Sequence, residues 1–176
     1  MVNDHHHQRM HDYLQDAKDK GAKIINLGEF DSSENNIVTT KVLLNVNDDM
    51  RVMKEEIFGP LLPVMVYEEL SEAVDYVNQH DHPLGLYFFG NKKSEQNFVI
   101  NNTRSGGVTI NDAMFHLMQS RLPLGGVGPS GYGHYHGHEG FLNFSNLRAI
   151  YYQTNSDSLF GALRPPRSKP FEMLSK

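Results

Sequence analysis

Residues 84–110 have the sequence LGLYFFGNKKSEQNFVINNTRSGGVTI, and this stretch decides the fold. The apolar run at 84–89 predicts a strand that is buried on both faces, and residues 107–110 predict a second strand. Between them, residues 94–102 have the apolar spacing of a helix. Two strands joined by a helix of this length indicate a βαβ crossover, in which the strands run parallel.

An amphipathic helix is predicted near the N-terminus. Four apolar residues recur there at helical spacing: Met10, Tyr13, Leu14 and Ala17. Asn3 or Asp4 can cap the start of this helix, and Gly21 can supply the left-handed residue that ends it. The first element is therefore a helix with both ends marked in the sequence.

The chain between this helix and residue 84 continues the alternation of strand and helix. Three segments are predicted strands: 22–27, 37–46 and 61–66. Residues 31–36 have the composition of a polar turn, and Ser71 is placed to cap a second helix. The fold class is therefore α/β, with a largely parallel sheet and flanking helices.

The regular alternation stops after residue 110. Residues 111–140 are rich in Gly, Pro, His and Tyr, and a loop of this length in a compact domain is usually functional. Residues 148–153 predict one more short strand. The polar residues from 155 onward are typical of a tail that lies across a neighbouring surface.

Composition excludes several classes of function. The formal net charge of −5 provides no basic surface for a nucleic acid, and no apolar run is long enough to span a membrane. The first residues do not resemble a secretory signal, so we expect a cytoplasmic protein. The chain has no cysteine, which excludes disulfides, cysteine-bound zinc and a thiol nucleophile within it.

Residues 126–131 (GVGPSG) match the G-x-G-x-x-G spacing of dinucleotide-binding folds. That motif binds a pyrophosphate only where a strand turns directly into a helix. Here a loop precedes the motif, and Gly133, His134 and Gly137 disfavour a helix after it. We interpret the segment as a tight backbone turn near a site.

Histidines cluster at residues 5–7 and again at His134, His136 and His138. Consecutive positions in a helix face different directions, so the first cluster cannot converge on one ion. The second cluster could line one face of an extended segment, but only Glu139 adds a ligand nearby. We therefore predict no metal site.

Residues 54–60 (KEEIFGP) place two acids before an aromatic residue and a Gly-Pro break between two predicted strands. One interpretation is a charged turn with Phe58 packed into the core. The other is a ligand site, because a carboxylate can accept hydrogen bonds from both hydroxyls of a ribose and a ring can pack on a planar nicotinamide. Spacing alone leaves both open.

Four segments together resemble the aldehyde dehydrogenase superfamily in order and spacing: 55–60 (EEIFGP), 105–112 (SGGVTIND), 122–131 (LPLGGVGPSG) and 135–137 (YHG). The YHG element and the residues after it are similar to the class 3 branch, and the RPP sequence at 164–166 is similar to bacterial coniferyl aldehyde dehydrogenases. The resemblance covers essentially the whole chain. It departs at Leu124, where the family usually has Phe; we expect this to alter packing and not chemistry.

The resemblance implies part of a longer enzyme. Residues 1–146 would belong to the catalytic domain, 147–154 would form an oligomerisation strand and 155–176 a C-terminal tail. Family members carry a nucleotide-binding domain, a nucleophilic cysteine and a glutamate base upstream, so residue 1 is expected to fall after that cysteine. The implied reaction oxidises an aldehyde to a carboxylic acid through a cysteine thioester, with NAD or NADP as cofactor. The chain alone is expected to bind no cofactor, to be inactive and to form a homodimer.

The resemblance also implies roles for residues of this chain. Glu56 should hold the hydroxyls of the nicotinamide ribose, and Phe58 should pack beside the nicotinamide ring. Asn111 should end a strand at the edge of the catalytic cleft and fix the local backbone. The residues implied to line or border the substrate funnel are Met114, Leu117, Met118 and His136. Flexible apolar side chains there suit an aromatic or medium-chain aldehyde.

Two alternatives remain from the sequence: a stand-alone nucleotide-binding module and a purely structural remnant. The first is disfavoured because the family's adenosine and pyrophosphate contacts lie outside the residues present here.

Overall fold

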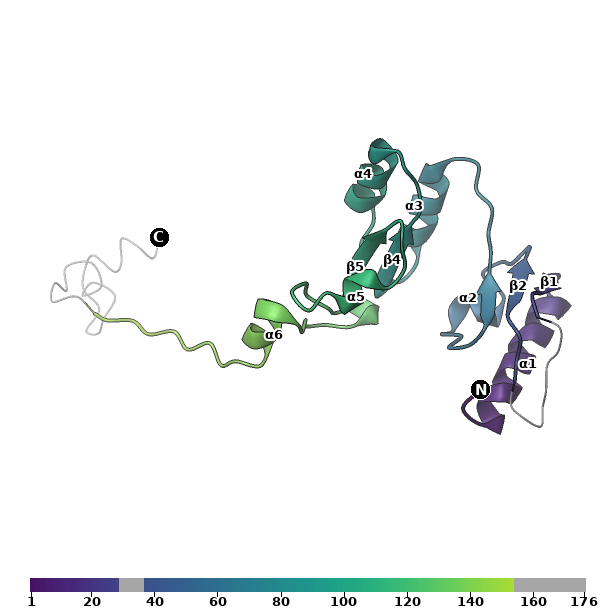
Figure 1. Cartoon of the computed structure of the whole chain (residues 1–176), viewed down its shortest axis with the longest axis horizontal. Coiled ribbons are helices and arrows are strands. Elements are labelled where there is room, and N and C mark those ends of the chain that lie inside the picture. Colours follow the sequence, from purple (N-terminus) through teal and green to yellow (C-terminus); the bar gives the residue numbers. More distant parts are fainter. Residues whose placement is uncertain (29–36, 154–176) are drawn as a thin grey trace, which may run out of the picture. The chain divides into compact units, whose positions relative to one another are not determined.

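The computed structural model of the chain describes residues 1–28 and 37–153, in two compact units, Met1–His80 and Asp81–Lys176 (Figure 1). The predicted turn at 31–36 and the tail from 155 onward lie outside the described residues. Helices and strands alternate in both units, which confirms the α/β class. The described helices are all too short or too polar to cross a membrane.

Unit 1 begins with helix α1 (Asp4–Asp19). The Asn3 side chain caps it by accepting a hydrogen bond from the His6 backbone N–H at 2.8 Å. Gly21 follows the helix with a φ of 96°, a conformation that glycine adopts without strain. The predicted cap and the predicted stop are therefore both confirmed. The residues that α1 buries are His7, Met10, Tyr13, Leu14 and Ala17.

The sheet of unit 1 has the strand order β1 (Lys23–Asn26), β2 (Lys41–Leu44), β3 (Leu61–Pro63). β1 runs antiparallel to β2, and β2 runs parallel to β3. Side chains from α1, from β2 and from the residue before helix α2 (Arg51–Lys54) share one core. The largest fully buried side chains of that core are Met10, Tyr13, Leu43 and Met50.

Helix α3 (Leu70–Gln79) corrects one prediction. Ser71 does not cap it, because the helix already begins at Leu70 and Glu69 occupies the cap position without a side-chain hydrogen bond. Instead, the Glu72 carboxylate in the first turn accepts a hydrogen bond from the Glu68 backbone N–H at 3.1 Å. An acid in the first turn also suits the positive end of the helix dipole.

Unit 2 contains the predicted crossover: β4 (Gly85–Phe88), α4 (Lys93–Asn102) and β5 (Gly107–Ile110). β4 and β5 pair in parallel from Gly85↔Gly107 to Phe88↔Ile110, as predicted. The expectation that the first of these strands is buried on both faces is wrong, because Tyr87 is 39% exposed. The sheet of unit 2 has two strands in the part of the chain that is described, so each strand has one neighbour there.

Residues 111–143 are mostly irregular but contain three short helical turns: α5 (Phe115–Met118), η1 (Gly128–Ser130) and α6 (Gly137–Asn143). The G-x-G-x-x-G segment contains η1. No described strand ends directly before the segment, and the next helix, α6, does not follow it directly. The strand-to-helix geometry of a phosphate cradle is therefore not present at these residues. The expectation that Gly133, His134 and Gly137 disfavour a helix after the motif is wrong, because α6 begins at Gly137 itself.

Residues 148–153 form no strand among the residues described. A strand needs a hydrogen-bonding neighbour, and no described strand pairs with this segment. Its apolar side chains are instead exposed, with Tyr152 at 85%. The oligomerisation role of 147–154 stays a prediction.

Candidate functional site

The two acids at the end of α2 have different surroundings. Arg51 Nε donates to Glu55 Oε1 at 2.9 Å, and the buried Tyr13 hydroxyl donates to Glu55 Oε2 at 2.9 Å. The hydrogen bond from Arg51, and to a smaller extent the one from Tyr13, hold the pKa of the Glu55 carboxyl below its ordinary value. Glu55 is therefore a structural acid that fastens the segment to α1 and α2.

Glu56 is exposed, and no residue in the described part of the chain bonds to its carboxylate. Its backbone carbonyl is held by α1, as are the next two carbonyls along the chain. The side chain is thus presented on a fixed backbone with its hydrogen-bonding capacity unused. This is the state required of a ribose-binding acid.

Phe58 does not pack into the core, because its side chain is 76% exposed. Its backbone has a φ of 49°, in the left-handed region where a phenylalanine is strained. The next residue, Gly59, lies close against α1, and a Cβ at this position would have to displace Met10 Sδ. The interpretation of Phe58 as a core residue is therefore wrong, and its ring remains available to a ligand.

In unit 2, Asn111 follows β5 and has a φ of 59°. Its side-chain Oδ1 accepts a hydrogen bond from the Gly90 N–H at 2.8 Å, and its own N–H donates to Phe88 O at 2.7 Å. Asn111 thus ties the ends of the two parallel strands together. Its place at a catalytic cleft stays a prediction.

The predicted substrate residues lie on and before α5. Met114 and Met118 are exposed, whereas Leu117 is half-buried. Met114 precedes the helix with a φ of 66°, again in the left-handed region. Two flexible thioether side chains therefore face solvent on a short turn whose backbone is constrained.

His116 anchors this turn, a role that was not predicted from the sequence. The residue is 8% exposed, and its Nδ1 lies 2.7 Å from Thr109 Oγ1 of β5. A Cβ on Gly107 would overlap the His116 ring, so the close approach of α5 to β5 depends on that glycine. The Nε2 atom of His116 is buried without a hydrogen-bond partner. The signal was present in the sequence as a lone histidine between Met114 and Met118.

His136 lies before α6 with a φ of 74° and is half-buried. Its ring packs edge-on against Tyr135, with ring centroids 4.6 Å apart, and its Nδ1 is buried without a partner. A buried polar atom with an unused hydrogen bond is uncommon and often marks a functional position.

Several residues with predicted site roles, in both units, have a strained backbone. Five non-glycine residues have a positive φ among those described: Asn45, Phe58, Asn111, Met114 and His136. Four of the five are residues for which the sequence predicts a site role. Left-handed non-glycine residues are uncommon, and strain of this kind persists mainly where function requires it.

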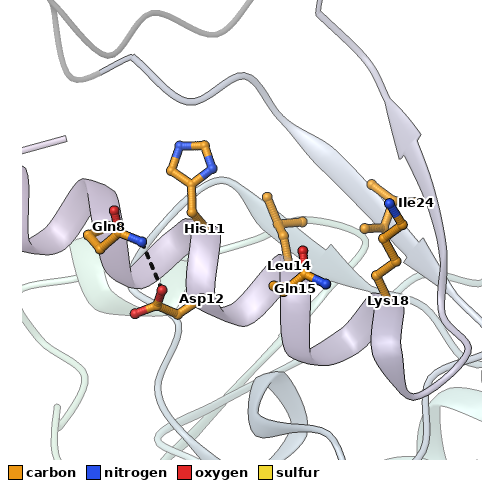
Figure 2. Close-up of a pocket in the computed structure, with 7 residues that line it drawn as sticks. All are labelled: Gln8, His11, Asp12, Leu14, Gln15, Lys18 and Ile24. Atoms are coloured by element: carbon orange, nitrogen blue, oxygen red, sulfur yellow. Dashed lines mark hydrogen bonds between the residues drawn. The ribbon is translucent and has the colours of Figure 1, made fainter.

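Figure 2 shows a pocket beside α1 that is separate from the predicted site residues. Its lining consists of Gln8, His11, Asp12, Leu14, Gln15, Lys18 and Ile24, and includes no predicted site residue. Among the described residues, no group of three or more His, Cys, Asp or Glu side chains could hold a metal ion. His7 and His11 contact each other, with their Nε2 atoms 3.4 Å apart.

Comparison with known proteins gives the class. Residues 1–150 match the model of the aldehyde dehydrogenase family, so the chain belongs to this family. It is 48% identical over 177 residues to a protein of Pseudomonas aeruginosa described as a probable coniferyl aldehyde dehydrogenase, a match that covers 99% of this chain and 36% of that protein. A rat relative, "Aldehyde dehydrogenase, dimeric NADP-preferring", is 40% identical over 149 residues, which are 85% of this chain and 32% of that protein.

A solved structure shares the fold. A substrate-bound state of Staphylococcus aureus AldH superposes with a TM-score of 0.78 at 35% identity, and the match covers 99% of this chain and 37% of that chain. The chain therefore spans about a third of the length of the proteins that it matches.

The pair of acids allows a test by pH. Since the folded pKa of Glu55 lies below its ordinary value of 4.5, its contribution to stability is present above that pH and is lost as the pH falls through the folded value. Glu55→Gln should therefore lower the stability of unit 1 at neutral pH and reduce its further loss in acid. Urea unfolding between about pH 7 and pH 3 measures both effects. Glu56→Gln is the matched control and should follow the wild type; a parallel acid decline for Glu55→Gln would contradict the assignment.

Proposed function

We propose that this chain is part of an NAD(P)-dependent aldehyde dehydrogenase that oxidises aromatic or medium-chain aldehydes to carboxylic acids. The observation that carries the proposal is the strained backbone at Phe58, Asn111, Met114 and His136 in a chain of this family. The similarity to a probable coniferyl aldehyde dehydrogenase supports an aromatic substrate.

The residues of unit 1 fit a nicotinamide cofactor. Glu56 offers an unpaired carboxylate for the ribose hydroxyls, and Phe58, two residues further along the chain, offers an exposed ring. The neighbouring acid, Glu55, is already engaged by Arg51 and Tyr13 and cannot take this role. When bound, the nicotinamide would accept a hydride from the aldehyde carbon. The rat relative is described as NADP-preferring, which supports NADP as one such cofactor.

The residues of unit 2 fit an aldehyde-binding role. Met114, Leu117 and Met118 would border the aldehyde, and their flexible side chains can adapt to a planar or an extended apolar group. His136 would lie at the mouth of the same funnel. Asn111 would keep the ends of β4 and β5 fixed beneath it through its bond to Gly90.

The nucleophile has to come from another part of the enzyme. The 176 residues contain no cysteine, so the thiolate that forms the thioester and its glutamate base would be supplied by the preceding part of the protein. This chain would orient the cofactor and border the substrate, and by itself it would have no activity.

A homodimer is the proposed assembly. Exposed apolar side chains gather on the last described segment: Phe144, Leu147, Ile150, Tyr151 and Tyr152. An exposed apolar surface of this kind marks a contact with another chain. The rat relative is described as dimeric, which supports a homodimer.

The proposed function predicts that the chain completes an enzyme. Fused behind the preceding two thirds of the Pseudomonas aeruginosa relative, or co-expressed with it, the chain should restore NAD(P)H formation from coniferaldehyde or benzaldehyde, whereas the chain alone should give none. The NAD(P)H absorbance measures both. The relative's own C-terminal third, joined in the same way, is the positive control. If neither the fused nor the co-expressed form gives a folded, active protein while that control does, the proposal is wrong.

Glu56→Gln in the active hybrid should weaken cofactor binding more than aldehyde binding. An amide keeps the shape of the side chain but loses charge-assisted hydrogen bonds worth about 1.5–3 kcal/mol, which corresponds to a loss of affinity of roughly tenfold to a hundredfold. Initial rates at varied NAD(P) and varied aldehyde separate the two. Glu69→Gln makes the same chemical change at an exposed acid without a side-chain cap bond and should have no effect. Unchanged cofactor kinetics in Glu56→Gln would remove the ribose role.

The chain by itself should self-associate, most simply as a dimer. Light scattering over a dilution series should give a mass above the 20.0 kDa of one chain, falling toward it as the protein is diluted. Tyr152→Lys should shift the equilibrium toward the monomer, because it places a charge in the apolar segment. A mass of one chain at every concentration would contradict the prediction.

A further inference from the structure

We propose that Arg9 and His6 of helix α1 are positioning residues for the cofactor. They hold the backbone of residues 56–58, the segment that would present Glu56 and Phe58 to the nicotinamide nucleoside. The inference rests on the proposed function and adds to it two residues from a different element.

Three successive carbonyl groups are bound from α1. Arg9 Nη1 donates to Glu56 O at 3.1 Å, and Arg9 Nη2 donates to Ile57 O at 2.8 Å. His6 Nε2 lies 2.7 Å from Phe58 O, and since a carbonyl oxygen can only accept, this nitrogen carries the hydrogen. None of the described strands pairs with this segment, so these three bonds fix its backbone instead of a strand ladder.

The guanidinium is itself held in place. Its Nη1 also lies 3.2 Å from the Tyr13 hydroxyl, and its carbon lies 5.3 Å from the centroid of the Tyr13 ring. Tyr13 is fully buried, so its contacts with the Arg9 guanidinium tie that group to the core of unit 1. A planar fork with two donors can bind two neighbouring carbonyls at once, which a lysine ammonium on a flexible stem cannot do in the same way.

The bonds coincide with the strained residue. A left-handed phenylalanine is unfavourable and persists only where its surroundings determine the conformation. Here the carbonyls of the two residues before Phe58 and of Phe58 itself are each held, and Gly59 lies against Met10 Sδ. Without these contacts the backbone would relax to a negative φ, and the exposed ring would point in another direction.

A merely structural clamp makes a different prediction. If Arg9 only stabilised unit 1, its loss would loosen the whole unit, and cofactor and aldehyde kinetics would decline together. A positioning role loosens residues 56–58 selectively and raises the KM for the cofactor more than it lowers kcat.

Limited proteolysis of the full chain tests the selectivity without a cofactor. Chymotrypsin can cut after Phe58, which is exposed, and after Tyr13, which is accessible only when α1 unfolds. Arg9→Gln should speed the cut after Phe58 on the order of tenfold and leave the cut after Tyr13 nearly unchanged. Lys18→Gln removes a charge from the exposed face of the same helix and is the matched control. Equal acceleration of both cuts, or of neither, would overturn the proposal.

The hybrid enzyme provides the second readout. Arg9→Gln and His6→Ala should each raise the cofactor KM, by about tenfold for the arginine, whereas His6→Gln should restore it because its amide can still donate. If the wild-type hybrid uses no cofactor, the proposed function fails, and the proteolysis still decides whether the clamp exists. If the hybrid uses a cofactor and Arg9→Gln leaves its KM unchanged, the positioning role alone is wrong.

Discussion

The packing of helix α1 on the core of unit 1 is the interaction on which the candidate cofactor segment depends. Met10 and Tyr13 are fully buried with Leu43 and Met50, and burying each such side chain contributes about 1.5–3 kcal/mol. The same side chains reach the segment after α2: the Tyr13 hydroxyl bonds to Glu55, and Met10 Sδ lies against Gly59. The core of unit 1 and the segment after α2 therefore depend on the same face of α1.

Unit 2 depends on a different constraint, the closeness of a ring to a glycine backbone. His116 can lie on β5 only because Gly107 has no side chain, and its bond to Thr109 then fixes the rotation of α5. With His116 turned inward, Met114 and Met118 remain exposed. Burial of one polar ring thus decides which side chains on and just before this four-residue helix are exposed to solvent.

The parts of this structure that the sequence predicted are local. The cap at Asn3 and the stop at Gly21 depend on neighbouring residues, and the crossover from β4 to β5 follows from the order of three consecutive elements. The clamp on residues 56–58 was not predictable, because its donors lie 47 to 52 residues away and residue spacing carries no record of such contacts. The positive φ of Phe58 was hidden for the same reason: tertiary contacts impose it against the preference of the residue type.

The strand predicted at 148–153 shows another limit. Branched and aromatic residues indicate that a segment can form a strand, but only a neighbouring edge makes it one. No such edge is available to it among the described strands, and Ile150 and Tyr152 are exposed instead.

The opposite surroundings of Glu55 and Glu56 follow from backbone geometry. Glu55 ends α2 with φ −114° and ψ 149°, an extended conformation, and successive side chains of an extended chain point to opposite sides. Once Arg51 and Tyr13 draw Glu55 toward the helices, Glu56 has to face away from them. The two neighbouring acids therefore differ: Glu55 is engaged by Arg51 and Tyr13, and the Glu56 carboxylate is left exposed with no bonding partner among the described residues.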